Sequence, residues 1–474
     1  MIVAFILFGV INETMGIAYI ATAAVCDLDL STSDKGLLSS MTFIGVMVAS
    51  YFGGFFGDTQ GRRKTVLVTL FCSTVVTSIS AFLNNFTLFL ICRFLSGVCV
   101  AGYSATVYAY IGEFNTDKNR AAIISWASCA IGVASILQPM TALWILSYEW
   151  RFELYEGYEL RPWRLLILIY VIPGVIGGLW LYKLPESPKY MLAQGRDTEA
   201  LEIVRWMYRT NKGKRSHDDL RIGKLKTETI ELSGKTYKGV KAIMMSLREQ
   251  TVPLFKPPYV LYFFACSLLH FGTFSVAGGM ALFMPDILNR LSKAQLSGKG
   301  DDLKICDVLQ LGNGTKEVNN SAAADYICDD SVDPSVFFDA AYIGVGMLIG
   351  FMALAALIKP LERRTIFVVT LSISGFSGVL LTFVTSHYLI IMLYCFLILF
   401  CGLNVSVING AACDIFPTHL RAMTVCVSMM FGRLGAALAC NLIGQLLEQN
   451  CELTYYMFSG LVFVCLGVSF ILPG

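Results

Sequence analysis

The sequence predicts an all-α membrane protein with twelve transmembrane helices in two six-helix bundles. Three observations support this fold class. The 474 residues are 55% hydrophobic and 15% charged, with a mean hydropathy of +0.64, which lies outside the soluble globular range. Twelve stretches are apolar over about 20 residues, the length that crosses a bilayer. The charged residues lie mostly in the loops between them, and the net charge of +2 gives no reason to expect a nucleic-acid partner.

The predicted spans fall into two sets of six. Taken in order they are residues 2–25, 36–57, 65–83, 87–112, 121–147 and 164–184, then 257–285, 336–358, 365–384, 388–413, 422–446 and 454–472. The first run is about 24 residues long, whereas a signal-peptide core has roughly 7–15 and follows a basic leader. We therefore expect an N-terminal bundle over 1–184, a polar linker over 185–256 and a C-terminal bundle over 257–474, with a long loop at 286–335.

The loops on the two sides of the membrane differ in charge. Basic residues recur in alternate short loops, which places those loops and both termini in the cytoplasm. The long loop falls on the opposite side and carries two glycosylation sequons, at Asn313 and Asn319. Cys306 and Cys328 share that loop and are either free or joined by a disulfide. Most of the other cysteines are expected to be small buried apolar residues, because no metal-binding spacing occurs.

One polar turn between the second and third spans is especially informative. It reads Gly-Phe-Phe-Gly-Asp-Thr-Gln-Gly-Arg-Arg-Lys over residues 54–64. This turn resembles the loop 2–3 signature of the major facilitator superfamily, G-x-x-x-D-R-x-G-R-R, with Thr59 in place of an arginine. The resemblance implies the major facilitator fold, two bundles around a cavity that opens alternately to either side. After span eight, Glu362-Arg363-Arg364 repeats the arginine pair.

The resemblance also implies charged gates at the cytoplasmic helix ends. An acid and an arginine seven residues apart flank the turn after span four, and the same spacing recurs after span ten. The segment Pro185-Glu186-Ser187-Pro188 resembles the P-E-S-P-R/K signature of sugar-porter and organic-ion branches. The alternative is that these charges only anchor the topology. The gating candidates are Asp58, Arg62, Arg63, Glu113, Arg120, Glu186, Asp414 and Arg421.

Within the superfamily, the chain resembles the synaptic vesicle glycoprotein 2 group, which is akin to organic-ion transporters. The resemblance lies in Ser33-Asp34-Lys35-Gly36, Trp163-Arg164, the Pro185–Pro188 segment and the stretch from Phe274 to Asp286. The loop over 286–335 is too short for the large lumenal β-domain of vertebrate members. The expected location is the plasma membrane or a secretory or synaptic vesicle membrane.

Ionisable residues inside spans are the first candidates for a substrate site, because a charge at bilayer depth is costly. Arg433 in span eleven resembles the arginine that meets anionic substrates in organic-anion transporters; alternatively it pairs with an acid such as Glu13. Glu13 is a candidate for proton coupling, for a cation contact or for a structural hydrogen bond. His270 either has a functional role or bonds a backbone carbonyl. The aromatic candidates for the cavity are Phe271, Phe274, Trp126 and Tyr342.

No enzyme motif is present. The glycines near residue 344 miss the dinucleotide-binding spacing, and no phosphate-binding loop occurs. We therefore predict a secondary transporter of a small organic solute, with an organic anion favoured, working as a monomer in the bilayer without cofactor or metal. The coupling ion would be H⁺ or Na⁺. The alternative is a non-transporting membrane scaffold or receptor of the synaptic vesicle glycoprotein type.

Overall fold

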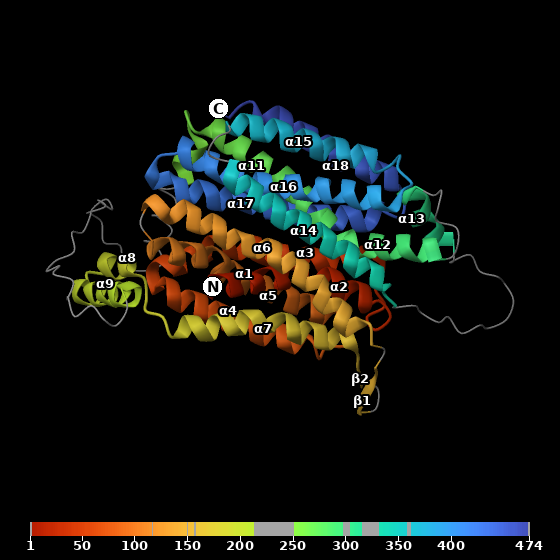
Figure 1. Ribbon diagram of the computed structural model, residues 1–474, viewed down its shortest axis with the longest axis horizontal. Coiled ribbons are helices and arrows are strands. Elements are labelled where there is room, and N and C mark those ends of the chain that lie inside the picture. Colours follow the sequence, from red (N-terminus) through yellow and green to blue (C-terminus); the bar gives the residue numbers. More distant parts are fainter. Residues whose placement is uncertain are drawn as a thin grey trace.

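The computed structural model describes residues 2–115, 117–148, 150–155, 158–212, 251–296, 304–314, 331–357 and 362–472. Long helices dominate and lie roughly along one direction (Figure 1). The N-terminal helices are α1 (Ile2–Met15), α2 (Ile17–Ala23), α3 (Thr32–Gln60), α4 (Arg62–Ser80), α5 (Phe86–Glu113), α6 (Asp117–Leu146) and α7 (Pro162–Tyr182). The C-terminal ones are α11 (Val260–Phe274), α12 (Ala281–Leu296), α14 (Pro334–Leu357), α15 (Arg363–Leu380), α16 (His387–Ile415), α17 (Thr418–Leu446) and α18 (Cys451–Ser469).

These helices confirm the predicted all-α membrane fold. By length and composition, nine described helical segments can cross a bilayer, or ten when α1 and α2, which meet at 41°, form one span. A π-helical turn at Ser275–Met280 joins α11 to α12, so these form a single span. Helices α4 and α15 are not among the ten, because both are short, begin with basic residues and contain several Ser and Thr side chains. Each nevertheless packs against two neighbours, α4 against α5 and α7 and α15 against α16 and α18.

The N-terminal and C-terminal helices form two groups that lie side by side, the first below the second in Figure 1. Contacts between the groups run mainly through α3 with α17, α6 with α14 and α2 with α12. We name the two ends of the molecule by their residues. The basic face is the end where α3 meets α4, at Arg62 and Arg63. The outer face is the end where α2 leads into α3.

Short elements decorate both ends. On the basic face, α8 (Pro188–Ala193) and α9 (Asp197–Lys212) follow α7, separated by Gly195 with a φ of +72°. A 3₁₀ turn at Val252–Phe255 precedes α11. On the outer face, β1 (Phe152–Tyr155) pairs antiparallel with β2 (Tyr158–Leu160) in a hairpin that projects from the bundle (Figure 1). This hairpin is not among the elements predicted from the sequence.

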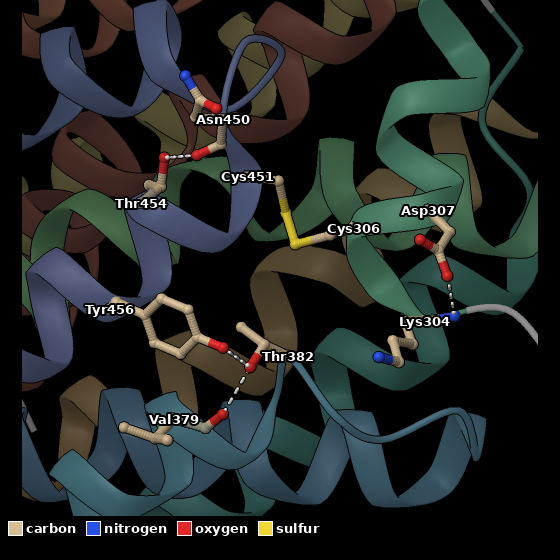
Figure 2. Close-up of a disulfide and its surroundings, with 9 residues drawn as sticks. All are labelled: Lys304, Cys306, Asp307, Val379, Thr382, Asn450, Cys451, Thr454 and Tyr456. Atoms are coloured by element: carbon tan, nitrogen blue, oxygen red, sulfur yellow. Dashed lines mark hydrogen bonds between the residues drawn. A yellow bond between two sulfur atoms is a disulfide. The ribbon is translucent and has the colours of Figure 1, made fainter.

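The disulfide prediction for Cys306 was wrong about the partner. Cys306 lies in α13 (Ile305–Gly314) and is bonded to Cys451, the first residue of α18, and not to Cys328 (Figure 2). The reason is spatial: α13 folds back over the end of α18, which brings together residues 145 positions apart. Cys26 is also disulfide-bonded. Cys328 and Asn319 lie outside the described residues, and of Asn313 only the backbone, in α13, is described.

Candidate functional site

The N-terminal group contains a buried ion pair. Glu13 on α1 and Arg93 on α5 are 6% and 2% exposed, and a guanidinium nitrogen of Arg93 lies 3.7 Å from a carboxylate oxygen of Glu13. Thr77 on α4 donates a hydrogen bond of 2.9 Å to the same oxygen. Arg93 also donates to the Ser80 hydroxyl at 2.8 Å. Helices α1, α4 and α5 therefore enclose an acid and a base within the N-terminal group.

Uncharged polar groups lie beside this pair on α1. The Asn12 amide donates to the backbone carbonyl of Tyr170 at 2.9 Å, and the Tyr170 hydroxyl donates to the carbonyl of Gln138 at 2.8 Å. The Gln138 amide in turn lies 3.5 Å from the Asn12 side-chain oxygen. Helices α1, α6 and α7 thus share a buried polar network. Adaptable amides and hydroxyls of this kind can hydrogen-bond a polar solute.

Arg433 occupies a different position from Glu13. It projects from α17 across the boundary between the groups and donates a hydrogen bond to the Ser50 hydroxyl of α3. The alternative that Arg433 pairs with Glu13 is wrong, since Glu13 faces Arg93. Among the residues that the structure describes, no acid lies within ion-pair distance of Arg433. The hydrogen bond to Ser50 occupies only one of the five N–H donors of the Arg433 guanidinium.

Helix α11 packs directly beside Arg433. The glycines on either side of the arginine allow this: a Cβ on Gly432 would lie 2.6 Å from the Phe274 ring, and one on Gly435 would meet the Phe271 carbonyl oxygen. Phe271 and Phe274 are half-buried. Phe271 and Phe274, the two aromatic candidates on α11, therefore lie where α11 contacts α17, close to the helical turn that carries Arg433.

His270 lies one residue before Phe271 and is completely buried. Its Nδ1 atom is 3.1 Å from the carbonyl oxygen of Cys266, as the backbone-carbonyl alternative predicted. Its Nε2 atom has no well-formed hydrogen bond, although the Asn409 side chain of α16 lies near it. Arg433 is close enough to act on the imidazole electrostatically. His270, Asn409 and Arg433 therefore mark one polar region among the C-terminal helices.

The other two aromatic candidates lie elsewhere. Trp126 is 72% exposed on α6, and Tyr342 is 67% exposed on α14. Each belongs to an apolar stripe with helical periodicity on the outside of its helix. The exposed members are Trp126, Val133, Leu137 and Trp144 on α6, and Phe338, Tyr342, Val345 and Ile349 on α14. Such stripes suit contact with lipid, and neither aromatic side chain lies with Glu13 or Arg433.

The predicted gating charges of the N-terminal half meet on the basic face. Arg62 lies 2.7 Å from Asp58 and 3.0 Å from Glu113, so it joins the ends of α3, α4 and α5. Its guanidinium also stacks over the Tyr190 ring, with the ring centroid 5.5 Å away. The side chain of Arg120, which lies in α6, is outside the described part of the chain.

Glu186 has a different role from a simple ion pair. Its carboxylate accepts hydrogen bonds from the backbone N–H groups of Arg63 and Lys64 at 2.8 and 3.3 Å, which satisfies the first turn of α4. Gly61 enters that turn with a φ of +101°, and a Cβ there would lie 2.6 Å from the Glu186 carboxylate. Arg63 donates to the carbonyls of Leu181 and Tyr182 at the end of α7.

The second half repeats part of this arrangement. Arg363 at the start of α15 pairs with Asp414 near the end of α16. Arg421 lies in α17, but its side chain is outside the described residues, so the predicted Asp414–Arg421 contact stays a prediction. In the part of the chain that the structure describes, each ion pair formed by Arg62 or Arg363 stays within its own half.

Sequence reasoning identified some of these residues and missed others. Glu13 and Arg433 were found because each is a charge inside an apolar span. Arg93 carries the same signal, a charge inside an apolar span, yet it was not among the predicted candidates. Ser50 gave no signal, because a serine in a span is common and usually bonds its own helix, as Ser50 also does to Val46 at 2.5 Å.

Long apolar helices packed in two groups, with opposite charges buried among them, define the class of this protein as a multi-pass membrane protein. Residues 6–281 match the profile of the family described as "Sugar (and other) transporter", which is more than half of the chain. The chain belongs to this family of the major facilitator superfamily.

Curated relatives support the predicted branch. Synaptic vesicle glycoprotein 2A of Rattus norvegicus is 27% identical over 307 residues, which is 60% of this chain and 41% of the relative. Synaptic vesicle glycoprotein 2C of Mus musculus is 26% identical over 247 residues, covering 50% of this chain and 34% of the relative. The chain therefore matches about two fifths or less of the length of these relatives.

Solved structures show the same fold. The partially occluded inward-open conformation of the xylose transporter XylE from E. coli matches 99% of this chain and 95% of its own, with a TM-score of 0.67 at 15% identity. The inward-open conformation of XylE matches with a TM-score of 0.66 at 14% identity. At this identity the likeness defines the fold alone, and it confirms the predicted major facilitator fold.

Proposed function

We propose that this chain is a secondary active transporter that moves a small organic solute by alternating access, with an organic anion favoured as substrate. The observation that carries the proposal is Arg433. It lies at the boundary between the helical groups, hydrogen-bonds Ser50 of the opposite group, and has no acidic partner among the described residues. Buried charges are normally paired, so an unpaired guanidinium here is suited to a charge that the substrate brings.

The chemistry of the guanidinium supports an anion. Its planar donors match a carboxylate or sulfate group bidentately, and such charge-assisted hydrogen bonds are strong where water is scarce. Phe271 and Phe274 would supply an apolar wall for the organic part of the solute, since both lie at the α11 surface that packs on this turn of α17. His270 and Asn409 add polar contacts on the same side.

Glu13 and Arg93 are proposed as the proton-coupling pair. The carboxylate of Glu13 is stabilised by the nearby guanidinium and by Thr77, and taking up a proton would release Arg93 from this pair. A change in charge at one helix contact can shift a two-state equilibrium between conformations. Proton coupling also agrees with the structural relative XylE, which is a proton:xylose symporter.

The basic face is proposed to be cytoplasmic, with both termini on that side and the outer face exposed to a vesicle lumen or the cell exterior. The clustered arginines of the basic face support this orientation. The charge clusters of Arg62 and Arg363 would then lie at the cytoplasmic ends of the two halves. Each would keep the helices of its half together while the halves move.

Uptake into proteoliposomes tests the proposal. Purified protein is reconstituted and supplied with a panel of radiolabelled organic anions and cations under inward and outward proton and sodium gradients. The variant Arg433→Gln should reduce uptake of the accepted anion by about tenfold or more, as expected when one charge-assisted contact worth roughly 1.4 kcal/mol or more is lost. Arg196→Gln is the matched control, because Arg196 pairs with Glu199 of the exposed helix α9, far from the boundary between the groups.

The outcomes separate transport from the alternative of a scaffold or receptor. Uptake of an anion that Arg433→Gln reduces to the predicted extent and Arg196→Gln leaves intact supports the proposal. If folded protein transports no member of the panel under any gradient, the transporter assignment fails and the scaffold alternative gains support. Uptake of cations with full activity in Arg433→Gln would contradict the anion assignment while leaving transport in place.

A further inference from the structure

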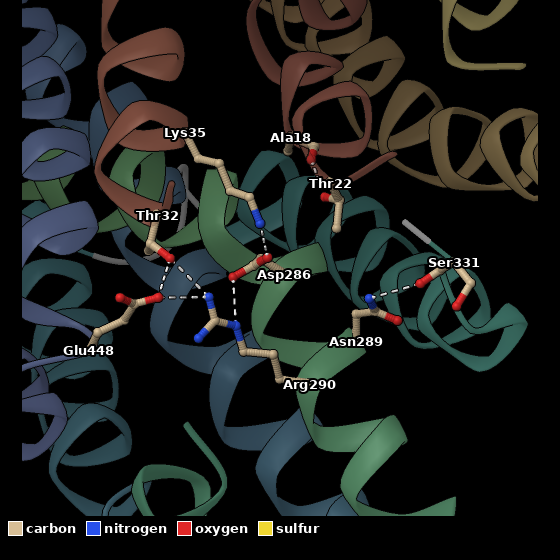
Figure 3. A network of polar contacts seen from close by, with 9 residues as sticks. All are labelled: Ala18, Thr22, Thr32, Lys35, Asp286, Asn289, Arg290, Ser331 and Glu448. Atoms are coloured by element: carbon tan, nitrogen blue, oxygen red, sulfur yellow. Dashed lines mark hydrogen bonds and ion pairs between the residues drawn. The ribbon is translucent and has the colours of Figure 1, made fainter. Parts of the chain in front are cut away.

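A network of charges joins the two halves on the outer face. Lys35 on α3 lies 2.5 Å from Asp286 on α12, and Arg290 on α12 lies 3.1 Å from the other oxygen of the same carboxylate. Arg290 also lies 3.2 Å from Glu448, which follows α17. Figure 3 shows the four charged side chains converging with Thr32, whose hydroxyl accepts from Arg290 at 3.0 Å and donates to Glu448.

The network is balanced and largely withdrawn from water. Among the described residues it holds two cations and two carboxylates, whose formal charges cancel. The Lys35 and Asp286 side chains are 11% and 8% exposed, while Arg290 and Glu448 lie nearer the surface at 22% and 30%. A pair this enclosed is costly to break on one side only, because the remaining charge stays buried without a partner.

Local sequence explains why these residues face one another. Ser31 and Asp34 form a capping box that starts α3, and Thr32, Lys35 and Gly36 then share one face of its first turns. Asp286 and Arg290 are one turn apart on α12. The two charged surfaces are therefore presented by rigid helix ends.

Close backbone packing surrounds the network. A Cβ on Gly36 would lie 2.5 Å from the Cys440 carbonyl oxygen of α17, and one on Gly444 would lie 2.8 Å from the Thr32 carbonyl oxygen. The ends of α3 and α17 therefore touch without intervening side chains. Opening the outer face would have to separate these backbones and break the ion pairs together.

The two faces of the molecule differ in this respect. On the basic face, the described ion pairs of Arg62 and Arg363 each stay within one half. On the outer face, Lys35 and Thr32 belong to the N-terminal half, and their partners Asp286, Arg290 and Glu448 belong to the C-terminal half. Charged contacts across the halves are thus found on the outer face of the described structure.

We propose that Lys35, Asp286, Arg290 and Glu448, with Thr32, form an outer latch that holds the outer face closed and must open for that face to admit or release solute. This inference rests on the proposed alternating-access function. The latch biases the transporter toward the state in which the outer face is shut. Weakening it shifts the population toward the state in which that face is open.

Hydrogen–deuterium exchange of the full chain in proteoliposomes tests the latch without any substrate. Asp286→Asn leaves Lys35 without its charge partner, so opening becomes easier and the amides of 26–40, 282–296 and 440–452 should exchange about tenfold faster or more. Glu448→Gln, at the more exposed end of the network, should give a smaller increase in the same segments.

Asp27→Asn is the matched control. Asp27 forms a 2.6 Å ion pair with Arg161 on the same face, but both residues belong to the N-terminal half. The control should leave exchange in 282–296 and 440–452 unchanged. Unaltered exchange in both Asp286→Asn and Glu448→Gln would overturn the latch, and so would a uniform increase along the whole chain or an equal increase in the control.

The exchange experiment tests the outer latch and the uptake experiment tests transport, so either proposal can be rejected without the other. Faster exchange in the latch variants without uptake of any solute would retain the outer latch and reject the proposed transport function. Uptake with unaltered exchange in the latch variants would retain transport and reject the latch. Thermal unfolding of each variant in detergent shows whether Asp286→Asn is folded, and Glu448→Gln provides the test if it is not.

Discussion

At the scale of single residues, buried charge separates the candidate site from the rest of the bundle. Glu13 and Arg93 neutralise each other between α1 and α5, whereas Arg433 has only a hydroxyl partner among the described residues. A membrane protein keeps an ionisable group at this depth only when it has a partner or a task. This contrast between a paired and an unpaired charge is the reason why we propose proton coupling for Glu13 and substrate contact for Arg433.

Substitution of Glu13 tests this division of roles. Glu13→Gln keeps the hydrogen bond with Thr77 but removes the group that exchanges a proton, so uptake driven by a proton gradient should fall by about tenfold or more, equivalent to roughly 1.4 kcal/mol. Exchange of labelled for unlabelled solute without a gradient should persist. Glu452→Gln, an exposed acid at the start of α18, is the control and should behave as the unmodified protein. Retention of full gradient-driven uptake in Glu13→Gln would contradict the coupling role.

At the scale of helices, glycines set how closely the N-terminal helices approach. A Cβ on Gly45 of α3 would meet the Phe94 carbonyl oxygen of α5 and lie 2.9 Å from the Val98 nitrogen. Likewise, a Cβ on Gly97 of α5 would meet the backbone of Thr42 in α3. This reciprocal pair of glycines is the small-residue packing expected where helices associate in a bilayer. It holds α5, and with it Arg93, against the N-terminal core.

Two alanine substitutions on α3 should have opposite effects. Gly45→Ala forces the helices apart and should lower the unfolding free energy by about 1–3 kcal/mol, as overpacking does. A Cβ added at Gly54 would have no atom within 4 Å, so Gly54→Ala should leave stability unchanged or raise it by up to about 1 kcal/mol through helix propensity. Thermal unfolding in detergent compares the two. Equal effects of both variants would show that the α3–α5 approach does not depend on Gly45.

At the scale of the whole molecule, long-range links tie segments that are distant in sequence. The bond between Cys306 and Cys451 fastens α13 across the end of α18, and the outer latch joins the two halves on the same side of the protein. On the basic face, the described charge clusters of Arg62 and Arg363 each stay within one half. The described ion pairs that join the two halves therefore lie on the outer face. Such contacts at one end only are what we expect of a state in which the outer face is closed.

The disulfide can be checked directly. Proteolysis without reduction, followed by mass spectrometry, should recover the Cys306 peptide linked to the Cys451 peptide. Cys451→Ser should lower the unfolding free energy by about 2–4 kcal/mol, because the covalent link restricts the unfolded chain. Cys72→Ser is the control, since Cys72 is free and exposed on α4. A Cys306–Cys328 peptide in its place would contradict the structure.

Much of the fold could be predicted from the sequence, because hydropathy and loop charge are properties of local stretches. The twelve predicted spans each overlap a described helix or helix pair, even α4 and α15, which are less apolar. Glu13 and Arg433 were also evident, since a charge inside an apolar run is visible without a structure. The motif at 54–64 indicated the family for the same local reason, although the structure places residues 54–60 in helix α3 and not in a turn.

Only the tertiary structure decided the partners. Arg93 faces Glu13, Ser50 meets Arg433, Cys451 bonds Cys306 and Asp286 pairs with Lys35, and each pair joins segments that the sequence separates. The structure also shows that Trp126 and Tyr342, predicted to line a cavity, lie on the outer surface. These contacts depend on how each helix is rotated about its axis and on which neighbour it packs against. A helix that is apolar on all sides has no polar face in its sequence from which that rotation could be predicted.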